Sequence, residues 1–206
     1  MSEQAAAVPA ATEDVAWASV NTPLSTDALK AFCKEDVERL FRINPMLEFK
    51  EWKSLGDNRY LFSAKNISQE TPFEFETEIQ VRETSDGLHV EYVNGLKSST
   101  EFRIEPAEQG SKLTITDRYD ALSEEDRSNR LGEVDKSIVI WAEYLQKFLI
   151  MWKKWFRFGL WRWYMRRIWQ PMKPSGRRIT YMLLWITLVE IALIILGVGI
   201  YFAEYA

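Results

Sequence analysis

The stretch Phe73–Arg82, FEFETEIQVR, decides the fold class because its apolar and polar residues alternate without a break. In an extended chain one set faces one way and the other set faces the opposite way. The first set is Phe73, Phe75, Thr77, Ile79 and Val81. Such alternation is typical of an antiparallel strand with one buried and one solvated face. The chain is therefore expected to contain a half-buried antiparallel sheet.

The same alternation continues on both sides of this stretch. We expect further strands over Val15–Thr22, Leu47–Lys53, Arg59–Asn66, Leu88–Tyr92, Thr100–Ile104 and Leu113–Tyr119. Turn signals that contain glycine separate most of them, at residues 56–58, 85–87, 94–95 and 109–111. Strands joined by such short turns form hairpins in series. The prediction is a curved antiparallel sheet of about seven strands.

Two helical regions accompany the strands. A helical pair is expected over Ser25–Arg42, between the first and second strands. A second helix is expected to start at Ser123–Asp126, which offers an N-cap serine and acidic first-turn residues. Its apolar stripe runs through Val134, Ile138, Trp141, Leu145, Phe148, Trp152, Trp155, Phe156 and Trp163. These spacings predict one long helix, around which the sheet wraps to bury its apolar face.

This order of elements is an α+β helix-grip arrangement, and it resembles the START-like or SRPBCC superfamily. That group includes the birch-pollen allergen fold, polyketide cyclase-like proteins and coenzyme-Q-binding START proteins. Besides the element order, the resemblance rests on the helical pair closing on Arg42–Pro45 and on the aromatic helix Ser137–Phe148. It covers about residues 15–155. The resemblance implies a cavity between sheet and long helix, which in relatives holds lipids, sterols, quinones or aromatic polyketides.

Alternation along the strands gives the residues that would line such a cavity. The candidates are Tyr60, Phe62, Phe73, Phe75, Thr77, Val90, Tyr92, Phe102, Ile115, Asp117 and Tyr119, with Trp141 and Leu145 from the helix opposite. The alternative is that most of them simply pack as core. Asp117 stands out, since a buried carboxylate is costly without a partner. It would orient a ligand hydroxyl, pair with Arg103, or sit at the wet end of its strand.

The sequence offers no catalytic signature, metal site or cofactor motif. Its one histidine, His89, alternates with Leu88 and Val90 and is expected to face solvent beside Glu91. Its one cysteine, Cys33, excludes an intramolecular disulfide. We name no catalytic residue. An enzyme would have to be of the cyclase or aromatase kind, working through diffuse cavity chemistry.

Residues 151–178 form a basic, tryptophan-rich collar. They hold five of the nine tryptophans and nine Lys/Arg without an acidic residue, whereas residues 1–150 carry a net charge of −11. Tryptophan and arginine favour the headgroup layer of a bilayer. The predicted interface residues are Trp152, Lys153, Lys154, Trp155, Arg157, Trp161, Trp163, Arg166, Arg167, Trp169, Arg177 and Arg178. Nucleic acid would suit the same composition but not the apolar segment that follows, so it is set aside.

That apolar segment, residues 179–202, is expected to be a transmembrane helix. Its 24 residues contain one ionisable side chain, Glu190. As a helix it rises about 36 Å, enough to cross a hydrocarbon core of about 30 Å. Pro171, Pro174 and Gly176 are expected to make a hinge before it. The positive-inside rule places residues 1–178 in the cytoplasm and the tail 203–206 outside, as a single-pass protein.

The predicted organisation is a disordered segment 1–14 without a signal peptide, a START-like domain 15–150, the collar and hinge 151–178, the span and the tail. Two function classes fit it. The first is a membrane-tethered protein that binds or transfers a hydrophobic ligand such as a lipid or quinone. The second is an accessory subunit or assembly factor with a filled core. It would contact a membrane protein through Glu190 and through the acidic row Glu74, Glu76 and Glu78.

Overall fold

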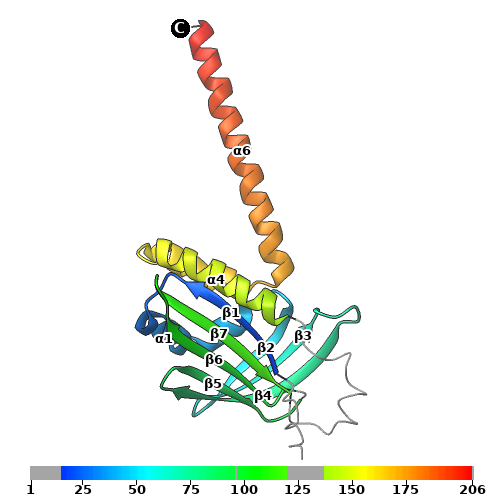
Figure 1. The fold of residues 1–206 in the computed structure, drawn as a ribbon. Helices are drawn as coiled ribbons and strands as arrows, with labels where there is room; N and C mark the ends of the chain where they lie inside the picture. Colours follow the sequence, from blue (N-terminus) through cyan, green and yellow to red (C-terminus); the bar gives the residue numbers. More distant parts are fainter. Residues whose placement is uncertain (1–14, 96, 120–136, 206) are drawn as a thin grey trace, which may run out of the picture. The chain divides into compact units, whose positions relative to one another are not determined.

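A computed structural model describes residues 15–95, 97–119 and 137–205 (Figure 1). The chain divides into two compact units, Met1–Arg162 and Trp163–Ala206. Each unit is described by itself.

The first unit is built on one antiparallel sheet of seven strands in the order β1-β7-β6-β5-β4-β3-β2. The strands are β1 Val15–Thr22, β2 Leu47–Gly56, β3 Arg59–Asn66, β4 Phe73–Thr84, β5 Gly87–Tyr92, β6 Ser99–Pro106 and β7 Ser111–Arg118. Six of these follow one another as a meander, and the first strand closes the order by pairing with the last. The predicted seven-stranded antiparallel sheet is confirmed.

Two turns show how local sequence fixes the hairpins. Gly56, Asp57 and Asn58 all have positive φ, at 88°, 49° and 57°, which glycine, aspartate and asparagine tolerate best. At the start of β5, a Cβ atom on Gly87 would lie 1.8 Å from the carbonyl oxygen of Phe102. Only glycine therefore allows β5 to approach β6 at this point.

The predicted helical pair is two helices, α1 Thr26–Glu35 and α2 Val37–Arg42, each with its own cap. The Ser25 side chain accepts a hydrogen bond from the Ala28 amide at 3.3 Å. The Asp36 carboxylate accepts one from the Arg39 amide at 3.0 Å. These caps satisfy amides that a helix start leaves open, so the break at Asp36 separates the two helices.

Helix α4, Ile138–Trp155, lies across the inner face of the sheet and contacts β1 and β7 (Figure 1). Its buried stripe contains Ile138, Trp141, Leu145, Phe148 and Trp152, as the spacing predicts. The Trp141 indole is 1% exposed and donates a hydrogen bond to the Leu40 carbonyl at 2.9 Å. Sheet, helical pair and long helix therefore enclose one core, and the predicted helix-grip fold is confirmed.

The prediction of one continuous helix through Trp163 is wrong. α4 ends at Trp155, and a separate short helix, α5 Gly159–Tyr164, follows. Beyond the buried Trp152, the apolar side chains of the stripe no longer pack into the core, since Trp155 and Phe156 are 42% and 40% exposed. Gly159, a poor helix former, marks the new start. The predicted start at residues 123–126, and Val134, lie outside the described residues.

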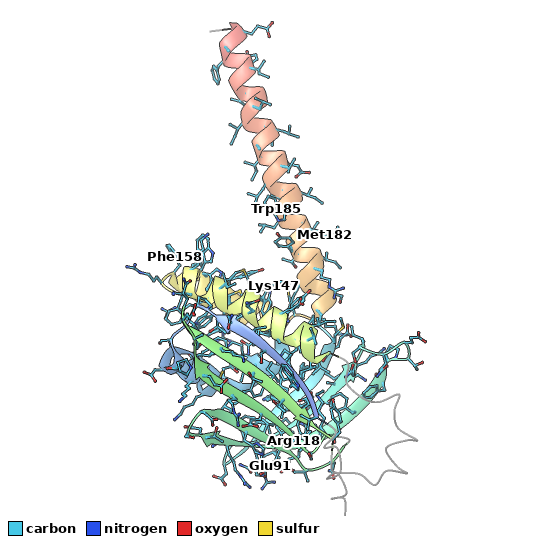
Figure 2. All side chains as sticks on the ribbon, viewed as in Figure 1. Glu91, Arg118, Lys147, Phe158, Met182 and Trp185 are labelled. Atoms are coloured by element: carbon cyan, nitrogen blue, oxygen red, sulfur yellow. The ribbon has the colours of Figure 1, made fainter. Side chains whose placement is uncertain are left out.

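The second unit continues with a π-helical turn, η2 Met165–Trp169, and one long helix, α6 Pro174–Tyr205. The break falls before Pro174, which fits the first turn of a helix because its missing N–H needs no partner there. The expected break at Gly176 is absent, because Gly176 lies within α6. Residues Pro174–Glu204 are long and apolar enough to cross a membrane, and the most apolar 18-residue window has a mean hydropathy of 2.5. Their side chains, such as Met182 and Trp185, point outward all round the helix (Figure 2).

The thiol of Cys33 lies fully inside the first unit. Burial raises the pKa of this thiol to about 12, although the nearby Arg39 charge acts to lower it. We expect iodoacetamide to leave Cys33 unmodified in folded protein at pH 8 and to label it rapidly in urea, as followed by intact mass. The pKa of an unfolded thiol is about 8.5. Because the folded pKa is higher, the free energy of unfolding should fall as the pH rises above that value. Fast labelling without urea would contradict this burial.

Candidate functional site

A cavity of about 90 Å³ lies between the inner face of the sheet, α2 and α4. Its walls come from β2, β3, β4, β5, the β5–β6 turn, α2 and α4. The lining residues are Phe41, Leu47, Phe62, Asn66, Phe73, Phe75, Thr77, Tyr92, Asn94, Gly95, Lys97, Tyr119 and Trp141. Aromatic rings form most of the lining, and the β5–β6 turn, called the polar end below, contributes Asn94 and Lys97. The cavity is therefore amphiphilic.

The apolar wall is a set of aromatic rings in mutual contact. Phe41 lies at its centre, with ring centroids 5.8 Å from Phe62 and 5.4 Å from Trp141. Phe62 in turn stacks on Trp52 at 5.0 Å and meets Phe75 edge-on at 5.9 Å. Tilted and edge-on pairs of this kind are the favourable arrangements for aromatic side chains. The wall is a packed surface contributed by three strands and two helices.

The polar end is organised by Asp117, whose side chain is fully buried in β7. Its Oδ2 lies 2.6 Å from the Lys97 ammonium, and its Oδ1 accepts a hydrogen bond from the Thr100 hydroxyl at 2.6 Å. The Thr100 oxygen also lies 3.0 Å from the Tyr92 hydroxyl. Lys97 and Tyr92 both line the cavity, so this chain of polar groups links its surface to a buried charge.

Asp117 is therefore part of a buried ion pair, which is the structural alternative that the sequence left open. Its partner is Lys97 and not Arg103. The Arg103 guanidinium lies on the outer face of β6, 3.2 Å from Asp86 and 3.6 Å from Glu101. Because residues 103 and 117 face opposite sides of the sheet, the predicted Arg103–Asp117 pair is wrong.

The structure divides the predicted cavity residues into two groups. Phe62, Phe73, Phe75, Thr77, Tyr92, Tyr119 and Trp141 line the cavity. Val90, Phe102, Ile115 and Leu145 are buried in the core beside it, Asp117 lies behind Lys97, and Tyr60 packs against Trp52. The polar residues Asn66, Asn94 and Lys97 and the apolar Phe41 and Leu47 were not predicted. Alternation within strands could not find them, because they lie in α2, at strand ends or in a turn.

The cavity is smaller than the ligand volume expected of a lipid carrier. Drug-sized ligands occupy pockets of roughly 300–1,000 Å³, whereas this one measures about 90 Å³. Thr77 helps to fix its size, since the hydroxyl donates to the Asn94 carbonyl at 2.8 Å and holds the β5–β6 turn against β4. In this conformation the cavity suits a small molecule and not a whole phospholipid.

The residues considered for acid-base or metal chemistry lie elsewhere. His89 is partly exposed on the outer face of β5, with its Nε2 3.7 Å from Glu91, as the alternation predicts. Within the described residues no group of three or more His, Cys, Asp or Glu side chains is placed to hold a metal ion. Two residues of the outer acidic row pair with cations from β2 and β3, since Lys50 lies 2.5 Å from Glu74 and Arg59 lies 2.7 Å from Glu78. The Lys50 hydrogen bond also lowers the pKa of Glu74.

The predicted interface residues fall into three kinds, which are buried, half-buried and exposed. Trp152 is 6% exposed and belongs to the core, where its ring meets the Phe32 ring at 5.3 Å and the buried guanidinium of Arg39 lies 4.7 Å from the Trp152 ring and 3.9 Å from the Phe32 ring. Trp161 and Trp169 are half-buried, and Arg177 stacks on Trp169 at 4.0 Å. The remaining ones are exposed: Lys153, Lys154, Trp155, Arg157, Trp163, Arg166, Arg167 and Arg178.

An open groove of about 620 Å³ lies on the first unit, between α1 and the last turn of α4. Its walls are mainly apolar, from Leu24, Ala28, Ala31, Phe32, Trp152 and Phe156, with Glu35 and Lys153 at the edges. Exposed Ile150, Met151, Trp155, Phe158 and Leu160 continue the apolar surface. Phe158, labelled in Figure 2, lies three residues after the end of α4. The end of α4 is therefore apolar and basic on its outside.

Glu190 lies midway along α6. Thr187, Glu190 and Gly197 recur at spacings of three and seven and share one helix face. The most apolar window of α6 is 0% buried within the described part of the chain.

The likenesses of this chain to known proteins are structural and distant. No family model matches the chain, and no curated protein sequence does either. Norcoclaurine synthase from Thalictrum flavum superposes with a TM-score of 0.48 at 12% identity, over 69% of this chain and 97% of that one. The STAR-related lipid transfer protein from Xanthomonas axonopodis gives 0.42 at 12% identity, over 65% and 84%. The lipid transfer and protein localization domain of human StarD13 gives 0.40 at 16% identity, over 65% and 75%.

These likenesses are distant, and the assignment rests on the chain's own strand order and helices. A seven-stranded antiparallel sheet, a helical pair after β1 and a long helix across the inner face are all present. The first unit of this chain thus has the START-like, or SRPBCC-like, helix-grip fold.

Proposed function

We propose that this chain is a membrane-anchored protein that binds a small hydrophobic or amphiphilic molecule between its sheet and α4. One observation carries the proposal, namely the connected cavity of about 90 Å³ with an aromatic wall and a polar end. A helix-grip core could pack solid here, as it does around the fully buried Val90, Phe102 and Leu145. The cavity instead lies where Lys97, which pairs with the buried Asp117, and aromatic residues such as Phe75 and Trp141 line the same space.

The anchor in this proposal is α6, and the collar orients the chain at the membrane surface. The exposed apolar and basic side chains from Ile150 to Leu160 support this role, because such a mixture favours the headgroup layer. The lack of acidic residues between Glu143 and Glu190 makes anionic lipid the complementary surface. Tethering would keep the cavity near apolar molecules dissolved in the bilayer and raise their effective concentration. Residues 1–178 would face the cytoplasm.

Native mass spectrometry of the full chain, purified in mild detergent, tests the binding proposal. We expect wild type to retain one class of small molecule and Thr77→Trp to lose it, because the new indole fills the cavity. Thr84→Trp is the matched control, since Thr84 lies on the same strand but is exposed. Asn94→Trp blocks from the exposed turn and serves if Thr77→Trp misfolds by circular dichroism. Wild type without any bound molecule, or with one that all variants retain, would overturn the proposal.

An accessory-subunit role is the second candidate, and the face of α6 that carries Glu190 favours it. A carboxyl group in hydrocarbon costs roughly 3 kcal/mol on insertion scales, so it gains from a hydrogen-bonding partner helix. In the same spectra this role predicts a retained membrane subunit that Glu190→Leu releases. Glu204→Leu, near the end of α6, is the matched control and should retain it.

A further inference from the structure

We infer that the groove between α1 and the end of α4 holds one acyl chain of an anionic phospholipid from the bilayer, with the phosphate of that lipid beside Lys153 and Arg162. The groove is separate from the cavity, because the two share no lining residue. The inference rests on the proposed role of the collar at the membrane surface. It adds to that role a binding site for a single lipid.

The shape of the groove suits an extended hydrocarbon chain. Ala28, Ala31 and Glu35 line it from one face of α1 at spacings of three and four, so the groove follows that helix for roughly 11 Å. Both alanines are exposed, and their small side chains leave space that larger ones would fill. The volume of about 620 Å³ falls within the range of roughly 300–1,000 Å³ typical of sites that bury most of a ligand.

The floor of the groove is apolar and aromatic. Phe32 and Trp152 are 3% and 6% exposed, and their rings meet at 5.3 Å. Phe156 is 40% exposed, and its ring lies 4.9 Å from that of Trp152. Hydrocarbon that covers these rings removes apolar surface from water, which is favourable. The floor therefore favours the chain of a lipid over a polar occupant.

Positive charge at the rim selects the kind of lipid. Lys153 lines the groove, and the Arg162 guanidinium lies 5.1 Å from the centre of the Phe156 ring. Both of these basic residues are exposed. Among the described lining residues, Glu35 is the one acid, and it lies 3.4 Å from the Arg39 guanidinium. Lysine and arginine beside an apolar groove complement a phosphate headgroup, and a headgroup without its own cation avoids repulsion from them.

The groove adjoins the exposed apolar side chains of the collar. Phe156 lines it, and the nearby Trp155, Phe158 and Leu160 are 42%, 57% and 79% exposed. Large apolar side chains that are exposed together mark a surface that meets a partner or a membrane. With basic residues among them they favour the headgroup layer. The bilayer is therefore the source of lipid to which the inference commits.

Photo-crosslinking of the full chain in phosphatidylcholine nanodiscs maps lipid chains onto the groove. Two probes are compared, a phosphatidylglycerol and a phosphatidylcholine, each with a diazirine in one acyl chain. Labelled peptides are identified by mass spectrometry. Label on α1 reports a chain in the groove, because α1 is not part of the collar. Label on residues 155–160 reports contact of the collar with the bilayer, and label on α6 reports the span.

We expect the anionic probe to label α1 at least about five-fold more than the zwitterionic probe. Ala31→Trp should remove the label on α1 and leave the label on residues 155–160, because the indole fills the groove. Thr84→Trp is the matched control, since Thr84 is exposed on β4 and does not line the groove. Ala28→Trp serves if Ala31→Trp misfolds by circular dichroism.

The double variant Lys153→Gln/Arg162→Gln tests the charge. It should lower the preference of α1 for the anionic probe by about five-fold or more and leave labelling by the zwitterionic probe unchanged. Lys50→Gln/Arg59→Gln is the matched control, because it removes two exposed cations from the sheet instead. That control should keep the preference of wild type.

The position of the label distinguishes this inference from the proposed function. Label on residues 155–160 but not on α1 would overturn the inference and leave the collar at the membrane, with another occupant, such as a partner segment, in the groove. Equal labelling of α1 by both probes, or label on α1 that the tryptophan variants retain, would also overturn it. Label confined to α6 would contradict the collar role as well. None of these results bears on the cavity, which native mass spectrometry tests separately.

Discussion

Replacing Trp141 with alanine is expected to lower the free energy of unfolding of the first unit by about 3–5 kcal/mol. The side chain is 1% exposed, and its ring meets Phe41 at 5.4 Å and Phe102 at 5.4 Å. Its indole N–H also bonds the Leu40 carbonyl at 2.9 Å, which would lose a buried donor. Urea unfolding of the full chain in detergent, followed by the circular dichroism of the sheet, measures the change.

Trp155→Ala is the matched control for this prediction. Trp155 has the same side chain on the same helix, but it is 42% exposed. We expect its loss to cost below about 1 kcal/mol, because a surface substitution removes little packing. Equal effects of the two substitutions would mean that α4 is not seated on the sheet through Trp141.

Replacing Lys97 with methionine is expected to cost about 3–5 kcal/mol, because it removes the cation from a buried pair. The Asp117 carboxylate is fully buried, and after the change the Thr100 hydroxyl at 2.6 Å would remain beside it without the countercharge of Lys97. Methionine keeps the length of the side chain, so packing is largely preserved. The same urea titration reports the loss.

A second substitution and a surface pair test whether charge is the cause. Adding Asp117→Asn to Lys97→Met should recover at least about 1 kcal/mol, since contacting charges couple. Lys53→Met is the matched control. Lys53 pairs with Glu51 at 2.8 Å on the surface, where water screens the pair, so its loss should hardly change the free energy of unfolding. If the double variant is no more stable than Lys97→Met, the loss is one of packing and not of charge.

The sequence predicts the fold well because the sheet is half-buried along its whole length. Alternation in β4, from Phe73 to Val81, and the turn residues at 56–58 each follow from local chemistry. The end of α4 could not be predicted in the same way. Trp155 and Phe156 continue the apolar spacing of Trp152. Only the three-dimensional structure shows that Trp152 is the last residue of this stripe that is buried in the core.

The cavity could be predicted only in part, for a related reason. Alternation identifies the inward residues of each strand, such as Phe62 and Thr77, but not which of them pack tightly and which border a hollow. Lys97 comes from a turn and reaches Asp117 across β6, a pairing that depends on strand register and not on spacing. Arg103 lies within β6, but its side chain faces the other side of the sheet.

The central claim is that the hollow between the sheet and α4 is a ligand site, and a bromine-labelled ring tests it most directly. The full chain is crystallised from a lipidic mesophase with 4-bromophenol at pH 6, where the phenol is neutral, and bromine is located by anomalous scattering. We predict a bromine peak bounded by Phe75, Trp141 and Lys97 in wild type and its absence in Thr77→Trp. Bromine found only along α6, with the hollow empty in both crystals, would contradict the account.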